Sequence, residues 1–434
     1  MRTRLRASFA AVVLLAACTH TDDSITLPVE HVERARELQL MPVPAVRVQS
    51  REEFTADAKK SANEETDDLI QRQHDWYGRL GFFPKSFDLR AGTGASSDLY
   101  VAYYSAETKL VTVVGTPGHS VLVHELTHAL QDQYFDLERV RPRHISSDEE
   151  LAREALIEGD AKMAEFRDLV WDRGDDPIAV LGSFVTVARG YEEATKLFRE
   201  SKRPLFLSAH AAFAYTFGAA FVGAGLLLSS SQWNYRRVNA LFKAANGPRS
   251  TKEVILAGAA VGPIVETGLS ELPRPIAANW VIEGVDRIGE WYTYVLLFPA
   301  ERDPTVLAAL TARWDGDQLV VLRKKDGSDE PSTSSSSGLV WTTAWEDDKA
   351  AAAFAAQLVR LHGATRKAEG GENAMTSTND GEEIWLEQRA RQVCFVKNLA
   401  PAIAGPLAHA ALYTENERRF EVLRGPSSKP AVVH

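Results

Sequence analysis

The spacing of apolar and polar residues predicts short strands near the N-terminus, helices in the middle of the chain and mixed elements towards its end. Three short apolar runs lie in the first part, at residues 43–48, 100–104 and 110–114. The last two are separated by a turn at Glu107 and Thr108. Runs of this length bounded by turn residues are typical of strands, so a small sheet is expected before the first long helix.

A helix is predicted directly after the first of these runs. Ser50 and Glu53 are spaced as in a capping box, in which each residue bonds the backbone N–H of the other. The helix is expected to run from there towards Leu80, because Gly81 follows and glycine ends helices. Residues 91–97 are rich in Gly and Ser and predict a loop.

The middle of the chain has helical spacing throughout. Helices are predicted over about 120–134 and, after a break at 141–143, over 147–172; residues 120–260 are expected to be mainly helical. Residues 211–232 carry no charge and approach the shortest length that spans a membrane. Glycines and hydroxyl-bearing residues interrupt this stretch, which favours a helix buried in a large domain.

Composition changes after about residue 275, and the rest of the chain reads as a separate α+β domain. Strands are predicted at five apolar runs: 280–282, 290–297, 319–322, 339–345 and 384–396. Helices are predicted over the Ala-rich residues 347–361 and over 400–412. The serine run at 332–337 and the polar stretch at 364–382 predict loops.

The whole chain is therefore expected to be α+β, with a mainly helical domain that follows a small sheet and a second, C-terminal α+β domain. Its 434 residues carry a formal net charge of −10, and no basic stripe stands out, so nucleic-acid binding is not expected. The two cysteines provide no disulfide framework. Cys394 lies in an apolar run and is expected to be buried.

The N-terminus has the features of a secretory signal. Arg2, Arg4 and Arg6 precede a short apolar run at residues 7–15. Leu15-Ala16-Ala17-Cys18 resembles the lipobox of bacterial lipoproteins. That resemblance implies that residues 1–17 are a signal peptide that is removed and that Cys18 carries lipid. A plain signal peptide with a chance cysteine is the alternative, while the apolar run is too short to span a membrane.

The clearest chemistry lies in His124-Glu125-Leu126-Thr127-His128, which has the pattern H-E-x-x-H. On a helix, His124 and His128 lie on one face and can bind one metal ion, with Glu125 beside it as a carboxylate base. This pattern is typical of Zn²⁺ hydrolases, which also need a third protein ligand and an open position for water. No third His follows at the H-x-x-G-x-x-H spacing, whereas Glu154 and Glu158 lie on the next predicted helix.

These residues resemble those of the gluzincin metallopeptidases, in which H-E-x-x-H is followed by a Glu on the next helix. Glu158-Gly159-Asp160-Ala161 is similar to the E-G-x-A segment around the ligand Glu of aminopeptidase-like gluzincins. Residues 124–137 (HELTHALQDQYFDL) are similar to a group of poorly characterised bacterial lipoproteins and secreted proteins regarded as zinc peptidases. The resemblance covers about residues 98–220, and more weakly 314–317 and 341–345. It implies a gluzincin-like catalytic domain at residues 86–270, after a tether, strand and helix at 18–85 and before the C-terminal domain at 271–434.

The third ligand is left open by spacing alone, because Glu154 and Glu158 lie four residues apart on one helix face. The resemblance implies that Glu158 binds the metal, with Glu154 behind it or at the surface. A variant in which Glu154 is the ligand and Glu158 orients a histidine is the alternative. If both carboxylates simply belong to an acidic helix face, the metal has two ligands and no complete site.

The resemblance also implies a mechanism. Zn²⁺ acidifies a bound water, Glu125 accepts its proton, and a further donor stabilises the oxyanion. Tyr215-Thr216-Phe217-Gly218 is similar to the Y-x-x-G segment that carries this donor in aminopeptidase-like gluzincins. Tyr215 is therefore expected to face the metal; a core tyrosine is the alternative reading, and His210 is another candidate donor.

Other residues near the motif have weaker signals. Asp132 lies one turn after His128 and could hold that imidazole; a solvated helix residue is the equal alternative. His119 falls off the ligand face and is expected at the helix start, and His31 has no ligand-like spacing. The strand at 110–114 leads into the metal helix, and the resemblance implies that it pairs with an extended substrate.

The sequence thus predicts a Zn²⁺ metallopeptidase that acts on a peptide or protein. The lipid on Cys18 would anchor it to a membrane on the extracytoplasmic side of a bacterial cell envelope, in the periplasm or at the outer membrane. The alternative is a non-catalytic binding or scaffold lipoprotein that retains a metallopeptidase fold. The presence of Glu125 argues against it, because binding alone does not require a base. No motif separates exopeptidase from endopeptidase or indicates an oligomeric state.

Overall fold

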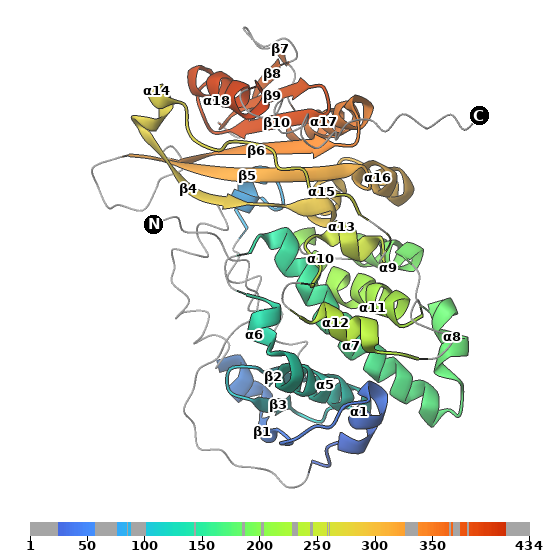
Figure 1. Cartoon of the computed structure of the whole chain (residues 1–434). Helices are drawn as coiled ribbons and strands as arrows, with labels where there is room; N and C mark the ends of the chain where they lie inside the picture. The colour runs from blue at the N-terminus through green and yellow to red at the C-terminus, as the bar shows by residue number, and fades with distance from the viewer. Residues whose placement is uncertain are drawn as a thin grey trace, which may run out of the picture.

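The computed structural model describes the fold for the following residues: 25–56, 76–84, 86–87, 101–142, 145–184, 187–200, 204–227, 233–243, 246–257, 259, 261–325, 337–363, 366–367, 374–379 and 382–413. The expected signal peptide at 1–17, Cys18, the loop at 91–97 and the serine run at 332–336 lie outside these residues. In the described part the fold is α+β, as expected, with two sheets. They lie at opposite ends of the molecule with helices between them (Figure 1).

The smaller sheet has three strands, β1 (Ala45–Gln49), β2 (Ala102–Ser105) and β3 (Leu110–Val114). The three predicted strands are confirmed, and their order is β1-β3-β2, with β1 parallel and β2 antiparallel to β3. Because β3 is the central strand, both of its edges are already paired. The expectation that the strand at 110–114 pairs with substrate is therefore wrong. The outer strands of this sheet are β1 and β2, and β2 is the one whose Tyr104 contacts Glu125.

The predicted capping box is confirmed. The Ser50 N–H donates to Glu53 Oε2 at 2.8 Å, and the Glu53 N–H donates to Ser50 Oγ at 3.1 Å. Residues 51–56 and 76–80 are helical, and the residues between them lie outside the described part of the chain. Gly81 follows with φ of 104°, a conformation that glycine adopts without strain.

Two long helices, α5 (His119–Phe135) and α7 (Ser147–Asp172), lie where the sequence predicts them. Ser146 caps α7 by accepting the Glu149 N–H, as serine does at helix starts. The short helix α6 (Leu137–Val140) joins them. Helix α5 and α1 (Val29–Arg36) pack on the small sheet through a shared apolar cluster. This packing explains why the middle of α5 is buried despite its polar residues.

The remaining helices of the middle region are α8 (Pro177–Phe184), α9 (Val187–Glu200), α10 (Leu205–Ala212), the π-helix η2 (Phe213–Phe217), α11 (Gly218–Leu227), α12 (Arg236–Leu241) and α13 (Thr251–Ile255). The run from α10 to α11 is, by length and composition, apolar enough to cross a membrane. However, 56% of its most apolar window is buried inside the structure. This is the environment of a core helix, as the glycines and hydroxyls indicated.

The larger sheet has seven antiparallel strands in the order β4-β5-β6-β10-β9-β8-β7. Its strands are β4 (Trp280–Asp286), β5 (Trp314–Lys324), β6 (Ser337–Trp345), β7 (Arg366–Lys367), β8 (Ala374–Asn379), β9 (Glu382–Arg389) and β10 (Gln392–Lys397). The helices of this part are α14 (Arg274–Ala277), α15 (Gly289–Leu297), α16 (Pro304–Thr311), α17 (Asp348–His362) and α18 (Pro401–Tyr413). Alternate β5 residues face opposite sides of the sheet. Leu319 and Val321 belong to the largest apolar core, whereas Val320 and Leu322 belong to a second apolar cluster, which includes residues of α18.

Three predictions for this region are wrong. Residues 290–297 form the helix α15 and not a strand; the helix is buried on all sides, so its apolar residues show no helical period. Residues 384–396 belong to two strands, β9 and β10, with a turn at Ala390, whose φ is 47°. The stretch 364–382, predicted as a loop, contains β7 and β8.

The main apolar core includes residues on both sides of position 270. Trp291 of α15 packs against Phe213 and Phe217 of η2, with ring centroids 5.2 and 5.1 Å apart. Its indole N–H donates to the carbonyl of Ala209 at 2.9 Å. Helix α15 therefore fills the core of the helical region. Cys394 is buried, as expected.

Candidate metal centre

Helices α5 and α7 bring three donor atoms together. His124 Nε2 lies 3.0 Å from Glu158 Oε2 and 3.1 Å from His128 Nε2. His128 Nε2 lies 3.5 Å from Glu158 Oε2. In a tetrahedral Zn²⁺ site with bonds of about 2.0 Å, neighbouring ligand atoms are about 3.3 Å apart. The three side chains thus already have the mutual spacing of zinc ligands, and the third donor is Glu158.

The charges of the three groups depend on one another. Burial by itself would lower the pKa of His128, but the Glu158 carboxylate raises it to about 9. The pKa of His124 is also raised, against its burial, by Glu158 and Glu165. Conversely, the two imidazoles hold the pKa of Glu158 well below its usual range although burial acts in the opposite direction. Glu158 is thereby kept ionised, the form in which a carboxylate binds a metal.

The Nδ1 atoms of both imidazoles, which are not among the three clustered donor atoms, have polar neighbours. His128 Nδ1 lies 2.9 Å from Gln131 Oε1, and the Gln131 amide donates to the Ile157 carbonyl and to Asp160 Oδ2 on α7. His124 Nδ1 lies 3.6 Å from Glu165 Oε2. Contacts of this kind orient ligand imidazoles and set their tautomer.

Neither Gln131 nor Glu165 was expected at the metal centre from the sequence. Gln131 is three residues after His128, and Glu165 is seven after Glu158, so helical spacing places each on the same side as its ligand. Asp132, expected in this role, instead accepts hydrogen bonds from the Tyr104 hydroxyl and the Leu137 N–H. The expectation for Asp132 is therefore wrong. On α5 the residue three positions after His128, and not the residue four positions after it, reaches the His128 ring.

Glu125 lies beside the donor atoms and next to β2. Its Oε2 accepts the Tyr104 N–H of β2 at 2.8 Å. Burial raises the pKa of Glu125, and the two imidazoles oppose that rise. A carboxyl group whose pKa is raised towards the pH at which the enzyme works is better suited to take up and release a proton.

Tyr215 lies near the ligands, on η2. Its ring centroid is 5.8 Å from that of His124, and the side chain is 41% exposed. This exposure does not fit the alternative of a core tyrosine. A single π-helical turn inside a longer helix is frequently found at functional sites.

Two glycines set the distance between Tyr215 and the ligand helix. A Cβ on Gly159 would overlap the carbonyl group of Gly218, and a Cβ on Gly218 would overlap the carbonyl oxygen of Ala155. The backbones of α7 and α11 therefore touch at this crossing. Gly159 follows the candidate ligand Glu158 directly, and Gly218 ends the segment that carries Tyr215.

The remaining candidates lie further from the donor atoms. Glu154 pairs with Arg141 and does not reach the imidazoles. His210 Nδ1 lies 3.1 Å from the Tyr292 hydroxyl. Its pKa falls to about 4, chiefly through burial and also through the charge of Arg141. His210 is consequently neutral at physiological pH.

The tryptophan-containing segment at 314–317 has a structural role. Asp317 accepts the backbone N–H groups of Ile288 and Gly289 at the start of α15, each at 2.8 Å. It also accepts the indole N–H groups of Trp314 at 3.0 Å and Trp341 at 3.3 Å. Burial raises the pKa of Asp317 to about 7. One carboxylate thus joins β5, β6 and α15.

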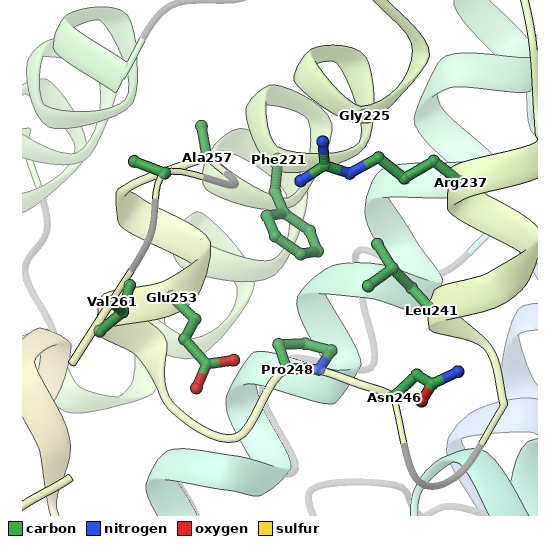
Figure 2. A pocket seen from close by; sticks show the side chains of 10 residues that line it. Phe221, Gly225, Arg237, Leu241, Asn246, Pro248, Glu253, Ala257 and Val261 are labelled. Atoms are coloured by element: carbon green, nitrogen blue, oxygen red, sulfur yellow. The ribbon is translucent and has the colours of Figure 1, made fainter. Parts of the chain in front are cut away.

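A cavity of about 230 Å³ is lined by residues from α11, α12 and α13 and the segments between them (Figure 2). Its lining includes Phe221, Leu241, Arg237 and Glu253, and none of the metal-centre residues contributes to it. Glu253 Oε2 accepts the Arg249 N–H at 3.0 Å, and the Glu253 N–H donates to the hydroxyl of Ser250, which caps α13. Its carboxylate is therefore engaged in local structure.

Comparison with known proteins finds a similarity for one part of the chain. Residues 281–411 match a family described as a domain of unknown function (DUF8575). No curated protein and no solved structure matches the chain. The matched residues contain Asp317 and most of the seven-stranded sheet, whereas the metal-centre residues lie before them. The similarity thus concerns the C-terminal part of the chain, and the candidate metal centre stands on its own geometry.

Proposed function

We propose that this protein is a Zn²⁺-dependent peptidase with a gluzincin-type site. One observation carries the proposal: the donor atoms of His124, His128 and Glu158 lie 3.0 to 3.5 Å from one another. The acid–base residue that a hydrolase needs, Glu125, directly follows the first ligand. Two imidazoles and one carboxylate form a typical ligand set of catalytic zinc and leave a position open for water.

The chain's own residues supply the other parts of the mechanism. A bound Zn²⁺ provides a Lewis acid and acidifies water. Glu125 takes the proton from the attacking water and passes it to the leaving amine. The Tyr104 N–H holds the Glu125 carboxylate in place by its Oε2 atom. The Tyr215 hydroxyl donates a hydrogen bond to the oxygen that becomes negative during the attack.

The substrate in this proposal is an extended peptide that lies along the outer edge of β2. This strand is at the end of the small sheet and contacts Glu125 through Tyr104. Backbone groups on a free strand edge bind extended peptides by adding a strand to the sheet. The scissile carbonyl would then lie between Glu125 and Tyr215.

We further propose that the enzyme is anchored by lipid on Cys18 and works on the extracytoplasmic side of a bacterial envelope. This rests on the basic residues, apolar run and Leu15-Ala16-Ala17-Cys18 of the N-terminus. Labelling with a radioactive fatty acid in a bacterial host tests it. Label should enter the wild type and not Cys18→Ser, and equal labelling of both contradicts the anchor.

Metal analysis and peptide cleavage test the enzymatic proposal. The wild type should bind zinc at the centre and cleave members of a peptide library, and His124→Ala should lose both properties. Glu125→Gln, which keeps the shape of the side chain, should keep the zinc and lose cleavage by at least about a hundredfold.

Two results would count against the proposal. Wild-type protein that binds no zinc at His124 would exclude the metal centre. A fully zinc-loaded wild type that cleaves no peptide would favour the non-catalytic binding lipoprotein.

A further inference from the structure

A second group of metal-binding side chains lies where α1, α5 and α7 meet. It consists of His31, His119, Asp168 and Asp172, and one donor atom from each lies within 4.8 Å of the others. His31 belongs to α1 and His119 is the first residue of α5. Because three separate helices contribute, no spacing along the sequence could indicate this group.

Asp168 is the centre of this group. His31 Nδ1 lies 2.8 Å from its Oδ1, and His119 Nε2 lies 2.9 Å from its Oδ2. The Asp168 side chain is only 3% exposed, whereas His31 and His119 are 36% and 48% exposed. The two imidazole rings meet edge to face with centroids 4.7 Å apart. A buried carboxylate is thus covered by two imidazoles that solvent can reach.

One cation already neighbours this carboxylate. Arg34 donates to Asp168 Oδ1 at 3.1 Å and lies 3.6 Å from Asp172 Oδ1. Its side chain is 48% exposed and stacks on Trp171, 4.9 Å from the ring centroid. Nearly half of this side chain is exposed, so burial does not hold the guanidinium on the carboxylates. A metal ion would take its place between Asp168 and Asp172.

We propose that His31, His119, Asp168 and Asp172 form a second Zn²⁺ site, separate from the candidate metal centre. Imidazole nitrogens and carboxylate oxygens both bind Zn²⁺, and these four side chains would fill all four positions of a tetrahedral site. Asp168 is ten residues after Glu158 on α7, a rise of about 15 Å along the helix. The two ions therefore share no ligand.

The second ion would hold α1 against the helices of the metal centre. Helix α1 already contacts that region through Arg36, whose Nε donates to Asp160 at 2.9 Å in a fully buried pair. Asp160 also accepts the amide of Gln131, which contacts the ligand His128. Zinc bound at His31 and His119 would thus stabilise the helix that supports the metal centre.

Zinc stoichiometry of the full chain, measured by plasma mass spectrometry after dialysis against buffered Zn²⁺, tests this proposal. The wild type should bind two ions, the His31→Ala/His119→Ala variant one, and His124→Ala one. Co²⁺ substitution identifies the site that each variant retains. The Co²⁺ absorption spectrum of His31→Ala/His119→Ala should be the part of the wild-type spectrum that His124→Ala lacks. His409→Ala, which removes an exposed histidine of α18, is the matched control and should bind two.

A milder variant covers the case in which the double substitution unfolds the chain. Asp172→Asn keeps the shape of an exposed side chain. It should lower the affinity for the second Zn²⁺ about tenfold or more without changing the circular dichroism spectrum. Wild-type protein with a single ion that is lost in His124→Ala would overturn the second site and leave the first intact. Two ions retained by His31→Ala/His119→Ala would overturn it equally.

Discussion

At the scale of single residues, Gln131 connects the two helices that hold the metal ligands. It accepts from His128 on α5 and donates to Ile157 and Asp160 on α7. Gln131→Ala should therefore lower zinc affinity about 10- to 100-fold, the usual effect of removing a residue that orients a ligand. Competition with a chromophoric chelator measures this change. Gln133→Ala, two residues later and exposed, should leave the affinity unchanged, and equal affinities in all three proteins would contradict the role of Gln131.

Glu290 is a second residue with a measurable consequence. It is 1% exposed, and neither carboxylate oxygen has a hydrogen-bond partner in the described part of the chain. Burial raises its pKa to about 8. The folded state thus binds a proton that the unfolded chain releases near its ordinary pKa of about 4.3. The contribution of Glu290 to stability is complete below that value and is lost as the pH rises towards 8.

The free energy of unfolding of the wild type should accordingly fall between pH 5 and 8, by up to about 1.4 kcal/mol per pH unit from this one proton. Glu290→Gln is neutral throughout and should gain a few kcal/mol over the wild type at pH 8, with little difference at pH 5. Urea unfolding at both pH values measures this. Exposed Glu193→Gln should follow the wild type, and a Glu290→Gln curve parallel to the wild type would refute the assignment.

At the scale of elements, the crossing of α7 and α11 decides where Tyr215 lies. Alanine in place of Gly159 would favour a helix by about 1 kcal/mol through propensity alone. Its Cβ would overlap the Gly218 carbonyl, so the helices must separate. We expect Gly159→Ala to lower the free energy of unfolding by about 3 kcal/mol. Denaturant unfolding measures it, with Gly262→Ala, whose Cβ meets nothing within 4 Å, as a near-neutral control; equal stability of both variants would exclude a close crossing.

Prediction of elements succeeded where the signal is local and failed where it is not. Helix α7 has a serine cap and many turns of helical spacing, and its predicted bounds agree with the structure. Helix α15 consists of aromatic and β-branched residues that read as a strand. It is helical because Asp317, far along the chain, accepts the two N–H groups at its start. Long-range capping of this kind leaves no trace in the helix's own residues.

At the scale of the whole molecule, the helical region and the seven-stranded sheet share one core. Besides the Trp291 contacts with η2, Arg287 Nε donates to the buried Asp148 of α7 at 2.9 Å. We expect a chain of residues 19–270 to lack a cooperative unfolding transition, because it loses α15 from its core. Thermal unfolding followed by circular dichroism tests this against residues 19–434. A cooperative transition with zinc bound in the shorter chain would contradict this, because it would show that residues 19–270 fold without the C-terminal part.

The sequence by itself determined the candidate ligands His124 and His128, the neighbouring Glu125, and the long helices that carry them. These features depend on spacing within one helix, which backbone geometry converts directly into a shared face. For the third ligand, the sequence left two candidates, Glu154 and Glu158. The tertiary structure decided for Glu158, because only the packing of α7 on α5 shows which carboxylate reaches the imidazoles.

The tertiary structure alone decided three further features: that Gln131 and not Asp132 contacts His128, that β2 and not β3 has the outer edge, and that His31 and His119 meet at Asp168. Each depends on how segments distant in sequence pack together. Side-chain spacing describes one segment at a time, so contacts made between segments become visible only in the folded chain.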